Sequence, residues 1–176
     1  DGFIHLLLRQ DNLNNDQNLY LQTIRKSSAH LLALINDVLD FSKIDAGKLE
    51  LDTATFDLEE AIFDVMDMLS PLAAQKHIDM AFYYADNVPK HVVGDALRFK
   101  QILTNLISNA IKFTPDGEII VRARMEQDDI GQCLLHFSVQ DSGIGLSGTD
   151  RKKLFESFSQ GDASVTRQFG GTGLGL

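Results

Sequence analysis

Three groups of polar and glycine residues in the second part of the sequence have the types and spacing needed to hold a nucleotide. In the first group, Asn105 and Asn109 are four positions apart and Lys112 follows three positions later, so a helix would carry all three on one face. A carboxamide oxygen is a neutral ligand for Mg²⁺, and a lysine ammonium group neutralises phosphate oxygens. Taken alone, the pattern is equally typical of a solvated polar stripe on an amphipathic helix.

The second group is the turn Asp141-Ser142-Gly143-Ile144-Gly145, which follows the alternating apolar pattern of a strand. Its glycines permit a tight turn and a close approach of a ligand to the backbone. The carboxylate of Asp141, at the end of the strand, could accept a hydrogen bond from an exocyclic amino group such as that of adenine. An ordinary Asp-Ser-Gly turn is the alternative interpretation.

The third group is the glycine-rich stretch 170–175, Gly-Gly-Thr-Gly-Leu-Gly, which offers backbone N–H groups that no side chain obstructs. A phosphate cradle needs such groups. The stretch is not a Walker loop, because no Lys-Ser or Lys-Thr follows it, and no strand leads directly into it as in a Rossmann motif. A flexible linker is the alternative, although leucine is unusual in linkers. The polar segment 147–169 between the two glycine groups is typical of a nucleotide lid.

The elements that must position these groups divide into a helical first part and a mixed α/β second part. The first part has a predicted short helix over 3–9 and a long helix over about 17–48. For the second part we predict, in chain order, a strand over 49–53, a helix that Asp57 caps and that ends near 75, strands over 78–84 and 91–94, a helix that Asp95 caps and that ends at 113, strands over 118–126 and 133–140, and a helix from Asp150 to about 156.

The long first helix carries an apolar seam with heptad spacing. The seam comprises Ile24, Ser28, Leu31, Ile35, Val38 and Ser42. Neighbouring leucines widen the apolar face to a width that suits a four-helix bundle. Because a helical hairpin supplies only two helices, a homodimer would bury this face most economically. Packing of the helix against its own globular domain is the alternative.

Composition narrows the classes of function. The net charge of −9, from 25 acidic and 16 basic residues, argues against a nucleic-acid partner. No run approaches the roughly 18 apolar residues of a membrane-spanning helix, so we expect no membrane contact in these residues. The five histidines and the single cysteine do not have metal-ligand spacing. The sequence has no initiator methionine and no signal peptide, so we expect an internal part of a longer protein.

The order of the motifs resembles that of a known family. Asn-x3-Asn-Ala-x-Lys-Phe over 105–113, Asp-x-Gly-x-Gly over 141–145, Phe-x2-Phe over 155–158 and Gly-x-Gly-x-Gly over 171–175 resemble the N, G1, F and G2 boxes of sensor histidine kinases. Residues 39–49, Leu-Asp-Phe-Ser-Lys-Ile-Asp-Ala-Gly-Lys-Leu, resemble the second dimerisation helix of hybrid kinases of the BarA/GacS type. The resemblance covers nearly the whole chain.

The resemblance implies an α+β fold with two domains. Residues 1–48 would form part of a helical-hairpin dimerisation and phosphotransfer domain. Residues 49–176 would form an ATP-binding α/β sandwich of the Bergerat (GHKL) type that lacks the C-terminal elements of the family. The chain is therefore expected to be truncated at both ends.

The resemblance also assigns site residues. Asn109 would coordinate Mg²⁺, Asn105 would lie beside it near the phosphates, and Lys112 would contact phosphate. Asp141 would bind the adenine amino group. The remaining predicted contacts are Gly143 and Gly145 at the nucleotide, Gly171, Thr172, Gly173, Leu174 and Gly175 along the phosphates, and Arg98 as a further cation near the domain interface.

The implied function is that of the cytoplasmic kinase core of an inner-membrane two-component sensor. Such a core binds Mg-ATP, transfers the γ-phosphate to a histidine, and passes it on to an aspartate of a response regulator or receiver domain. The His-Glu-Ile-Arg-Thr-Pro-Leu type of acceptor segment is absent, and Asp1-Gly2 resembles the residues that follow it. The acceptor histidine is therefore expected upstream of Asp1.

Two alternative functions remain open from the sequence. One is a catalytically inactive, kinase-like regulatory module that dimerises with a kinase. The other is an ATP hydrolase of the gyrase and Hsp90 superfamily. Related hydrolases carry a glutamate base where Asn105 stands, and a carboxamide cannot take a proton from water. This difference favours phosphate transfer over hydrolysis.

Overall fold

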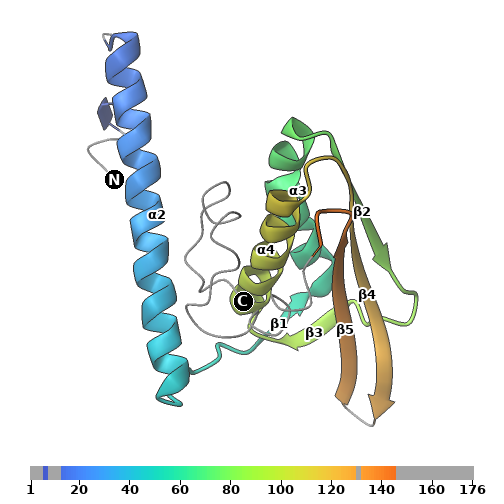
Figure 1. The fold of residues 1–176 in the computed structure, drawn as a ribbon. Helices are drawn as coiled ribbons and strands as arrows, with labels where there is room; N and C mark the ends of the chain where they lie inside the picture. The colour runs from blue at the N-terminus through green and yellow to red at the C-terminus, as the bar shows by residue number, and fades with distance from the viewer. Residues whose placement is uncertain (1–5, 8–12, 130–131, 146–176) are drawn as a thin grey trace. The chain divides into compact units, whose positions relative to one another are not determined.

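The computed structural model describes residues 6–7, 13–129 and 132–145, and it divides the chain into two units, 1–50 and 51–176. The first unit contains the long helix α2 (Asn15–Asp45) (Figure 1). The Asn14 carboxamide accepts a hydrogen bond from the Gln17 N–H at 2.8 Å, and the Gln17 side chain accepts one from the Asn14 N–H at 3.0 Å. This capping box starts the helix earlier than predicted. The helix also ends before the predicted Lys48, because Ala46 caps it and Gly47 turns the chain at a φ of 63°.

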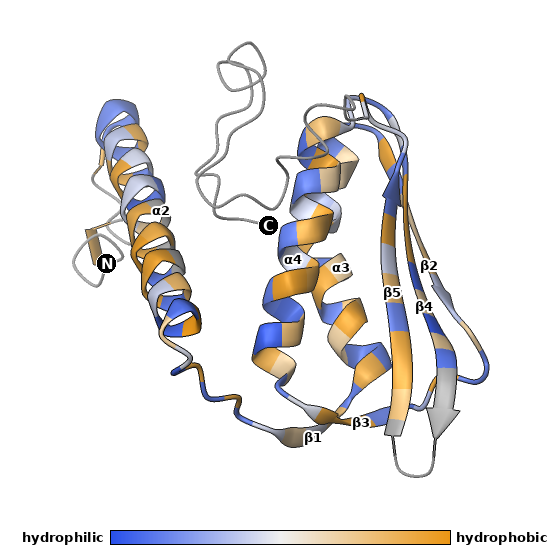
Figure 2. Cartoon of the chain, turned by 60° about the horizontal axis from the view of Figure 1, so that its bottom comes forward, coloured by the Kyte–Doolittle hydropathy of each residue, from blue (hydrophilic) through white to orange (hydrophobic). Residues whose placement is uncertain are grey.

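Within the first unit, α2 exposes much of its apolar seam. Ile24 is 50% exposed, Leu31 59%, Ile35 47% and Val38 45%. Figure 2 shows apolar and polar residues interspersed along this helix. Of the predicted short helix over 3–9, only Leu6 and Leu7 are described, and both are helical. Coverage of the seam by a second copy stays a prediction.

The second unit is an α/β domain with two sheets. Its elements are β1 (Ala54–Asp57), α3 (Leu58–Gln75), β2 (Ile78–Tyr84), β3 (His91–Gly94), α4 (Ala96–Phe113), β4 (Gly117–Asp129) and β5 (Gln132–Asp141). The main sheet has the order β2-β4-β5, with β2 and β4 parallel and β4 and β5 antiparallel. β1 and β3 form a separate antiparallel pair.

One predicted strand was wrong. Residues 49–53 alternate in polarity, but the structure forms its strand over Ala54–Asp57 instead. The reason is the partner, because β3 is only four residues long and pairs Gly94 with Ala54 and His91 with Asp57. All four residues of β3 are thus paired with Ala54–Asp57, and β3 has no residue left to pair with 49–53. The other described elements of this unit agree with the prediction to within a few residues, which confirms the α+β class.

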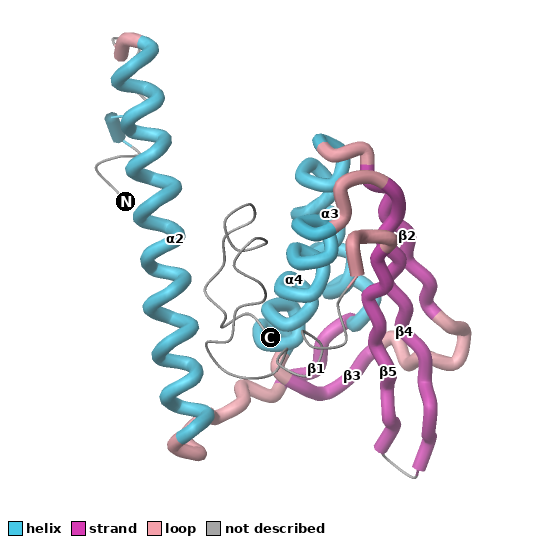
Figure 3. The backbone as a smooth tube through the Cα atoms, in the orientation of Figure 1, coloured by secondary structure: helices cyan, strands magenta, loops and turns pink. Residues whose placement is uncertain are grey.

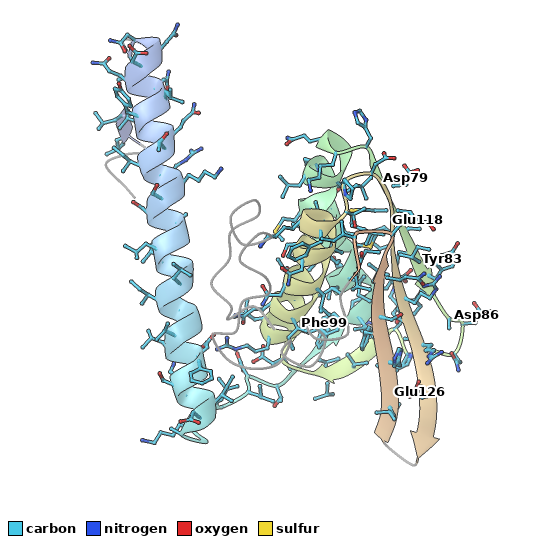
Figure 4. The ribbon with its side chains drawn as sticks, in the orientation of Figure 1. Asp79, Tyr83, Asp86, Phe99, Glu118 and Glu126 are labelled. Atoms are coloured by element: carbon cyan, nitrogen blue, oxygen red, sulfur yellow. The ribbon has the colours of Figure 1, made fainter. Side chains whose placement is uncertain are left out.

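Helices α3 and α4 cover one face of the main sheet (Figure 1). The fully buried side chains come from all layers: Leu58 and Ile62 of α3, Ile107 of α4, and Ile119 and Val121 of β4. Figure 4 shows Asp79, Tyr83 and Glu118 on the side of the sheet away from these helices. None of the helices that the structure describes is long and apolar enough to cross a membrane.

Aspartates fix the start of both helices of this domain. Asp57 accepts a hydrogen bond from the Glu60 N–H at 3.0 Å, and Asp95 accepts one from the Arg98 N–H at 3.0 Å. Asp95 also accepts from the Asp52 N–H at 3.1 Å. These backbone hydrogen bonds lower the pKa of both carboxyl groups below the usual value. Both predicted N-caps are thereby confirmed, and the start of α4 is tied to the chain that leads into β1.

Candidate functional site

Helix α4 has one buried side and one polar side. Leu103, Ile107, Ala110 and Ile111 are buried in the core. Asn105, Asn109 and Lys112 are half-buried on the rest of the helix surface, so they have access to a ligand while their backbone is fixed. The Lys112 ammonium group lies 4.9 Å from the centre of the Phe113 ring. This side of α4 therefore offers two neutral oxygen ligands and one cation.

Lys76, the residue that follows α3, binds the C-terminal end of α4. Its Nζ donates hydrogen bonds to the carbonyl oxygens of Ile111 at 2.7 Å, Lys112 at 3.0 Å and Thr114 at 3.3 Å. These carbonyls lack partners within the helix, and a cation at this end is favoured by the helix dipole. Lys76 was missed from the sequence, since no spacing rule links it to carbonyls some 35 positions away.

The turn that follows β5 lies against this same end of α4. Asp141 pairs in register with the fully buried Ile119, so side-chain alternation puts its carboxylate on the helix side of the sheet. The carboxylate accepts a hydrogen bond from the Gly143 N–H at 2.9 Å. The Ile144 N–H donates to the Phe113 carbonyl at 3.2 Å. Figure 3 shows both connections, α4 to β4 and the loop after β5, as loops. The hydrogen bonds therefore bring the first and second predicted groups together.

Gly143 and Gly145 have separate reasons to be glycine. A Cβ on Gly143 would lie 2.5 Å from the Phe113 oxygen and 2.9 Å from the Phe113 carbonyl carbon, both backbone atoms that hold α4. Gly145 has a φ of 67°, a left-handed conformation that side chains other than glycine rarely adopt. At Gly143 the close approach is that of the protein backbone, and close approach of a nucleotide to Gly143 and Gly145 stays a prediction.

Ser142 ties the turn to the neighbouring strand and was missed from the sequence. Its Oγ accepts from the Glu118 N–H at 2.9 Å, and its own N–H donates to the Glu118 carbonyl at 3.1 Å. Gly117 lies beneath Ser142 Oγ with a φ of 124°, and a Cβ there would collide with that oxygen. The sequence does not predict this contact, because nothing in it links Gly117 and Glu118 at the start of β4 with a serine that follows β5.

Arg98 belongs to another part of the molecule. It lies in the first turn of α4, where its Nη1 donates to Gln101 Oε1 at 2.8 Å. Lys112 lies in the last turn, about 20 Å away along the helix axis. The two cations therefore do not share one binding site.

The part of the predicted site around α4 fits a nucleotide that brings its own magnesium ion. Within the described residues, no group of three His, Cys, Asp or Glu side chains could hold a metal. The Asn109 carboxamide alone would bind Mg²⁺ weakly, but this ion usually keeps several waters and takes one or two protein ligands together with substrate phosphates. Gly171, Thr172, Gly173, Leu174 and Gly175, and the segment 147–169, lie outside the described residues.

Comparison with known families identifies both parts of the chain with kinase domains. Residues 1–47 match the family described as His Kinase A (phospho-acceptor) domain. Residues 94–176 match the family described as Histidine kinase-, DNA gyrase B-, and HSP90-like ATPase.

Individual relatives extend over the whole chain. The sensor histidine kinase GacS of Pseudomonas protegens is 50% identical over 175 residues, which are 99% of this chain and 19% of GacS. The crystal structure of full-length ShkA in complex with AMPPNP superposes with a TM-score of 0.77 at 36% identity, covering 99% of this chain and 35% of ShkA. The histidine kinase ThkA in complex with the response regulator TrrA has a TM-score of 0.60 at 26% identity, covering 90% of this chain and 45% of that one. The chain thus spans about a fifth of the curated relative that it matches.

Proposed function

The chain belongs to the sensor histidine kinases, of which it carries the phospho-acceptor and ATPase-type domains, and from this we propose that it binds Mg-ATP beside the C-terminal end of α4. One observation supports this location above all others. The hydrogen bond from Ile144 to the Phe113 carbonyl joins the turn that carries Asp141 to the helix that carries Asn109 and Lys112. This main-chain hydrogen bond forms a joint between the parts that carry the groups needed for base and phosphate.

Each side chain has a chemical task in this proposal. The Asp141 carboxylate accepts a hydrogen bond from the exocyclic amino group of adenine, while its bond to the Gly143 N–H keeps it in position. Lys112 neutralises phosphate oxygens. Asn109 offers its carboxamide oxygen to the magnesium ion that accompanies the nucleotide, and Asn105 lies beside it near the phosphates. When bound, the ion would spread the developing charge of the phosphates.

The reaction we propose is transfer of the γ-phosphate to a histidine. The histidine nitrogen attacks the γ-phosphorus, the bond from that phosphorus to the bridging oxygen breaks, and ADP leaves. Asn105 cannot act as a base toward water, which disfavours hydrolysis. The accepting histidine is supplied from outside these 176 residues, and an aspartate of a response regulator or receiver domain takes the phosphate next. ThkA was solved with a response regulator, which supports that order of partners.

We also propose that α2 forms a homodimer through its exposed apolar seam and that the whole protein is an inner-membrane sensor whose kinase core faces the cytoplasm. The match of residues 1–47 to a phospho-acceptor domain and the exposure of Ile24, Leu31 and Val38 support the dimer. Sedimentation of the wild-type chain beside a Leu31→Lys variant tests it. A wild-type chain that stays monomeric at micromolar concentration contradicts the dimer.

Nucleotide titration of the protein that contains this chain tests the site. We expect Asp141→Asn to weaken ADP binding about tenfold or more, because a charged acceptor is worth roughly 1.5–3 kcal/mol. Asp79→Asn is the matched control, since Asp79 is an exposed carboxylate on the opposite face of the same sheet. Equal affinities for the two variants would contradict the assignment of Asp141.

The fate of the γ-phosphate separates the three possible functions. A kinase gives acid-labile, base-stable phosphoprotein when incubated with γ-labelled ATP. A hydrolase releases inorganic phosphate without such a product, and an inactive regulatory module does neither. Substantial hydrolysis by the wild-type protein without phosphohistidine would refute the kinase proposal.

A further inference from the structure

Strand β2 has one paired edge and one open edge. All seven residues of β2 are in register with β4, and the order β2-β4-β5 leaves the other edge of β2 without a strand among the described residues (Figure 3). The Ala85 N–H, just after β2, donates to a carbonyl of β4 at 3.1 Å. Because peptide groups alternate in direction along a strand, the N–H and C=O groups of Met80, Phe82 and Tyr84 point to the open edge. This edge therefore offers a row of backbone donors and acceptors.

The sequence of β2 lacks the features that usually protect an open edge. Soluble proteins keep such edges short, or place lysine, proline or a bulge there to prevent another strand from pairing. β2, Ile-Asp-Met-Ala-Phe-Tyr-Tyr, contains neither lysine nor proline, and its register with β4 runs without a shift. The net charge of −9 opposes the pairing of identical copies along this edge. An unprotected edge on such a chain favours a different polypeptide as its partner.

An aromatic cluster of Phe63, Phe82 and Tyr84 lies beside the open edge, on the helix side of the sheet. Phe63 of α3 is 56% exposed, and its ring centre lies 5.7 Å from that of Phe82 in an edge-to-face arrangement. The Phe82 ring centre lies 5.8 Å from that of Tyr84. Phe82 and Tyr84 are partly buried against the core, so Phe63 provides most of the open apolar surface.

Phe63 lies on the side of α3 that faces away from α4. Asp64, the next residue, is paired with Lys100 of α4 at 2.6 Å. One residue turns a helix by about 100°, so Asp64 lies to one side of the buried Ile62 and Val65, and Phe63 lies to the other. A strand added to the open edge of β2 would therefore place every second side chain beside Phe63 and Phe82.

The surroundings of the open edge are acidic. Asp79 lies at the start of β2 and Asp86 just beyond its end, and both carboxylates are exposed (Figure 4). Burial and the charges of Glu59 and Asp57 raise the pKa of Tyr84, which places Glu59 near the same edge. Within the described part of the chain, Asp79, Asp86 and Glu59 form no ion pair. The charge that would complement this edge is therefore positive.

We propose that the open edge of β2 binds an extended polypeptide segment in which apolar and basic residues alternate. The segment adds to the sheet as a further strand, with its apolar side chains beside Phe63 and Phe82 and its lysine or arginine side chains on the outer face, between Asp79 and Asp86. Main-chain hydrogen bonds supply affinity, and the alternation supplies specificity. This inference goes beyond the proposed nucleotide site, which uses none of these residues.

Titration of the whole protein with synthetic peptides tests the proposal without depending on the folding of a variant. The probe is acetyl-Val-Lys-Val-Lys-Val-Lys-Val-amide, which matches the length of β2. We expect saturable binding of the probe, and binding about tenfold or more weaker for the peptide with glutamate in place of lysine. Two further versions carry N-methyl groups on the backbone nitrogens of the valines or of the lysines.

In a strand these two sets of N–H groups point to opposite edges. One N-methylated version should therefore lose binding about tenfold or more, and the other should keep it. No saturable binding of the probe, or equal binding of the two N-methylated versions, overturns the inference.

A pair of variants locates the binding surface. Phe63→Lys removes the exposed ring and adds a charge that repels the probe, so it should weaken probe binding about tenfold or more. Leu72→Lys is the matched control, because Leu72 is 50% exposed on the same helix and lies about two and a half turns along it, on the opposite side. Equal affinities of the two variants for the probe overturn the inference.

ADP titration of the same samples keeps this inference separate from the proposed function. Both variants should bind ADP as the wild type does, since neither Phe63 nor Leu72 belongs to the nucleotide site. If the wild type binds the probe but no ADP, the proposed function has failed and the inference about β2 stands. Self-association that Phe63→Lys abolishes, without binding of the probe, would assign the edge to a second copy and overturn the inference.

Discussion

Replacing Lys76 by methionine tests whether the cation that holds the end of α4 stabilises the domain. Methionine keeps an unbranched side chain of similar length and removes the three donors. The bonds at 2.7 and 3.0 Å are short, and the third at 3.3 Å is longer and weaker. Hydrogen bonds from a charged donor contribute roughly 1.5–3 kcal/mol, and a cation at a helix C-terminus adds about 0.3–1 kcal/mol. Since contributions from one group are not additive, we expect a loss of about 2–4 kcal/mol in the free energy of unfolding.

The assay is urea unfolding of the α/β unit followed by circular dichroism, with ADP titration on the same samples. Lys90→Met is the matched control, because Lys90 is 65% exposed in its side chain and makes one ion pair with Asp57 at 3.4 Å. An exposed pair of this kind contributes at most about 1 kcal/mol. Lys76→Met should also weaken ADP binding, because the last turn of α4 carries Lys112 and the Phe113 carbonyl. If both variants unfold at the same urea concentration, the reasoning about Lys76 is refuted.

Three further substitutions probe other parts of the domain. Gly143→Ala should lower the free energy of unfolding by about 1–3 kcal/mol through overpacking and should displace the turn, since its Cβ would meet the Phe113 oxygen at 2.5 Å. Urea unfolding measures the first effect and ADP titration the second, and a variant with wild-type values in both would contradict the prediction. Asp95→Asn should make the free energy of unfolding depend less on pH in the acid range, because the hydrogen bond from the Arg98 N–H lowers the pKa of Asp95 below 3.8. The wild type holds this extra stability above about pH 4 and loses it as the pH falls through the lowered pKa. Parallel curves of stability against pH for the two proteins would contradict this prediction. Phe99→Leu should cost roughly 1–2 kcal/mol, since its ring lies 5.1 Å from that of Phe137, and an unchanged urea midpoint would exclude that contribution.

Local chemistry made the helices of the α/β domain predictable. Asp57 and Asp95 are strong N-cap residues, and each lies directly before an apolar pattern of helical period. The predicted strand over 49–53 was wrong because alternation of polarity shows only that a segment can be a strand. Whether it becomes one depends on a partner, and β3 pairs with the next four residues instead.

The candidate site was predictable only as far as its signals are local. Asn105, Asn109 and Lys112 lie within one helix, so spacing alone puts them on a common side. Lys76 and Ser142 act on backbone atoms far along the sequence, and no periodicity encodes such contacts.

The joint between α4 and the turn after β5 has a consequence for mutational scanning. Its central bond joins the Ile144 N–H to the Phe113 carbonyl, so both partners belong to the main chain. Replacing Ile144 by alanine leaves that bond intact, and Phe113→Ala would report on the ring and its contact with Lys112 and not on the bond. The addition of an atom at Gly143 would test it directly, because there the space is already filled by Phe113. A sensitive point of this surface is therefore a position with no side chain to remove.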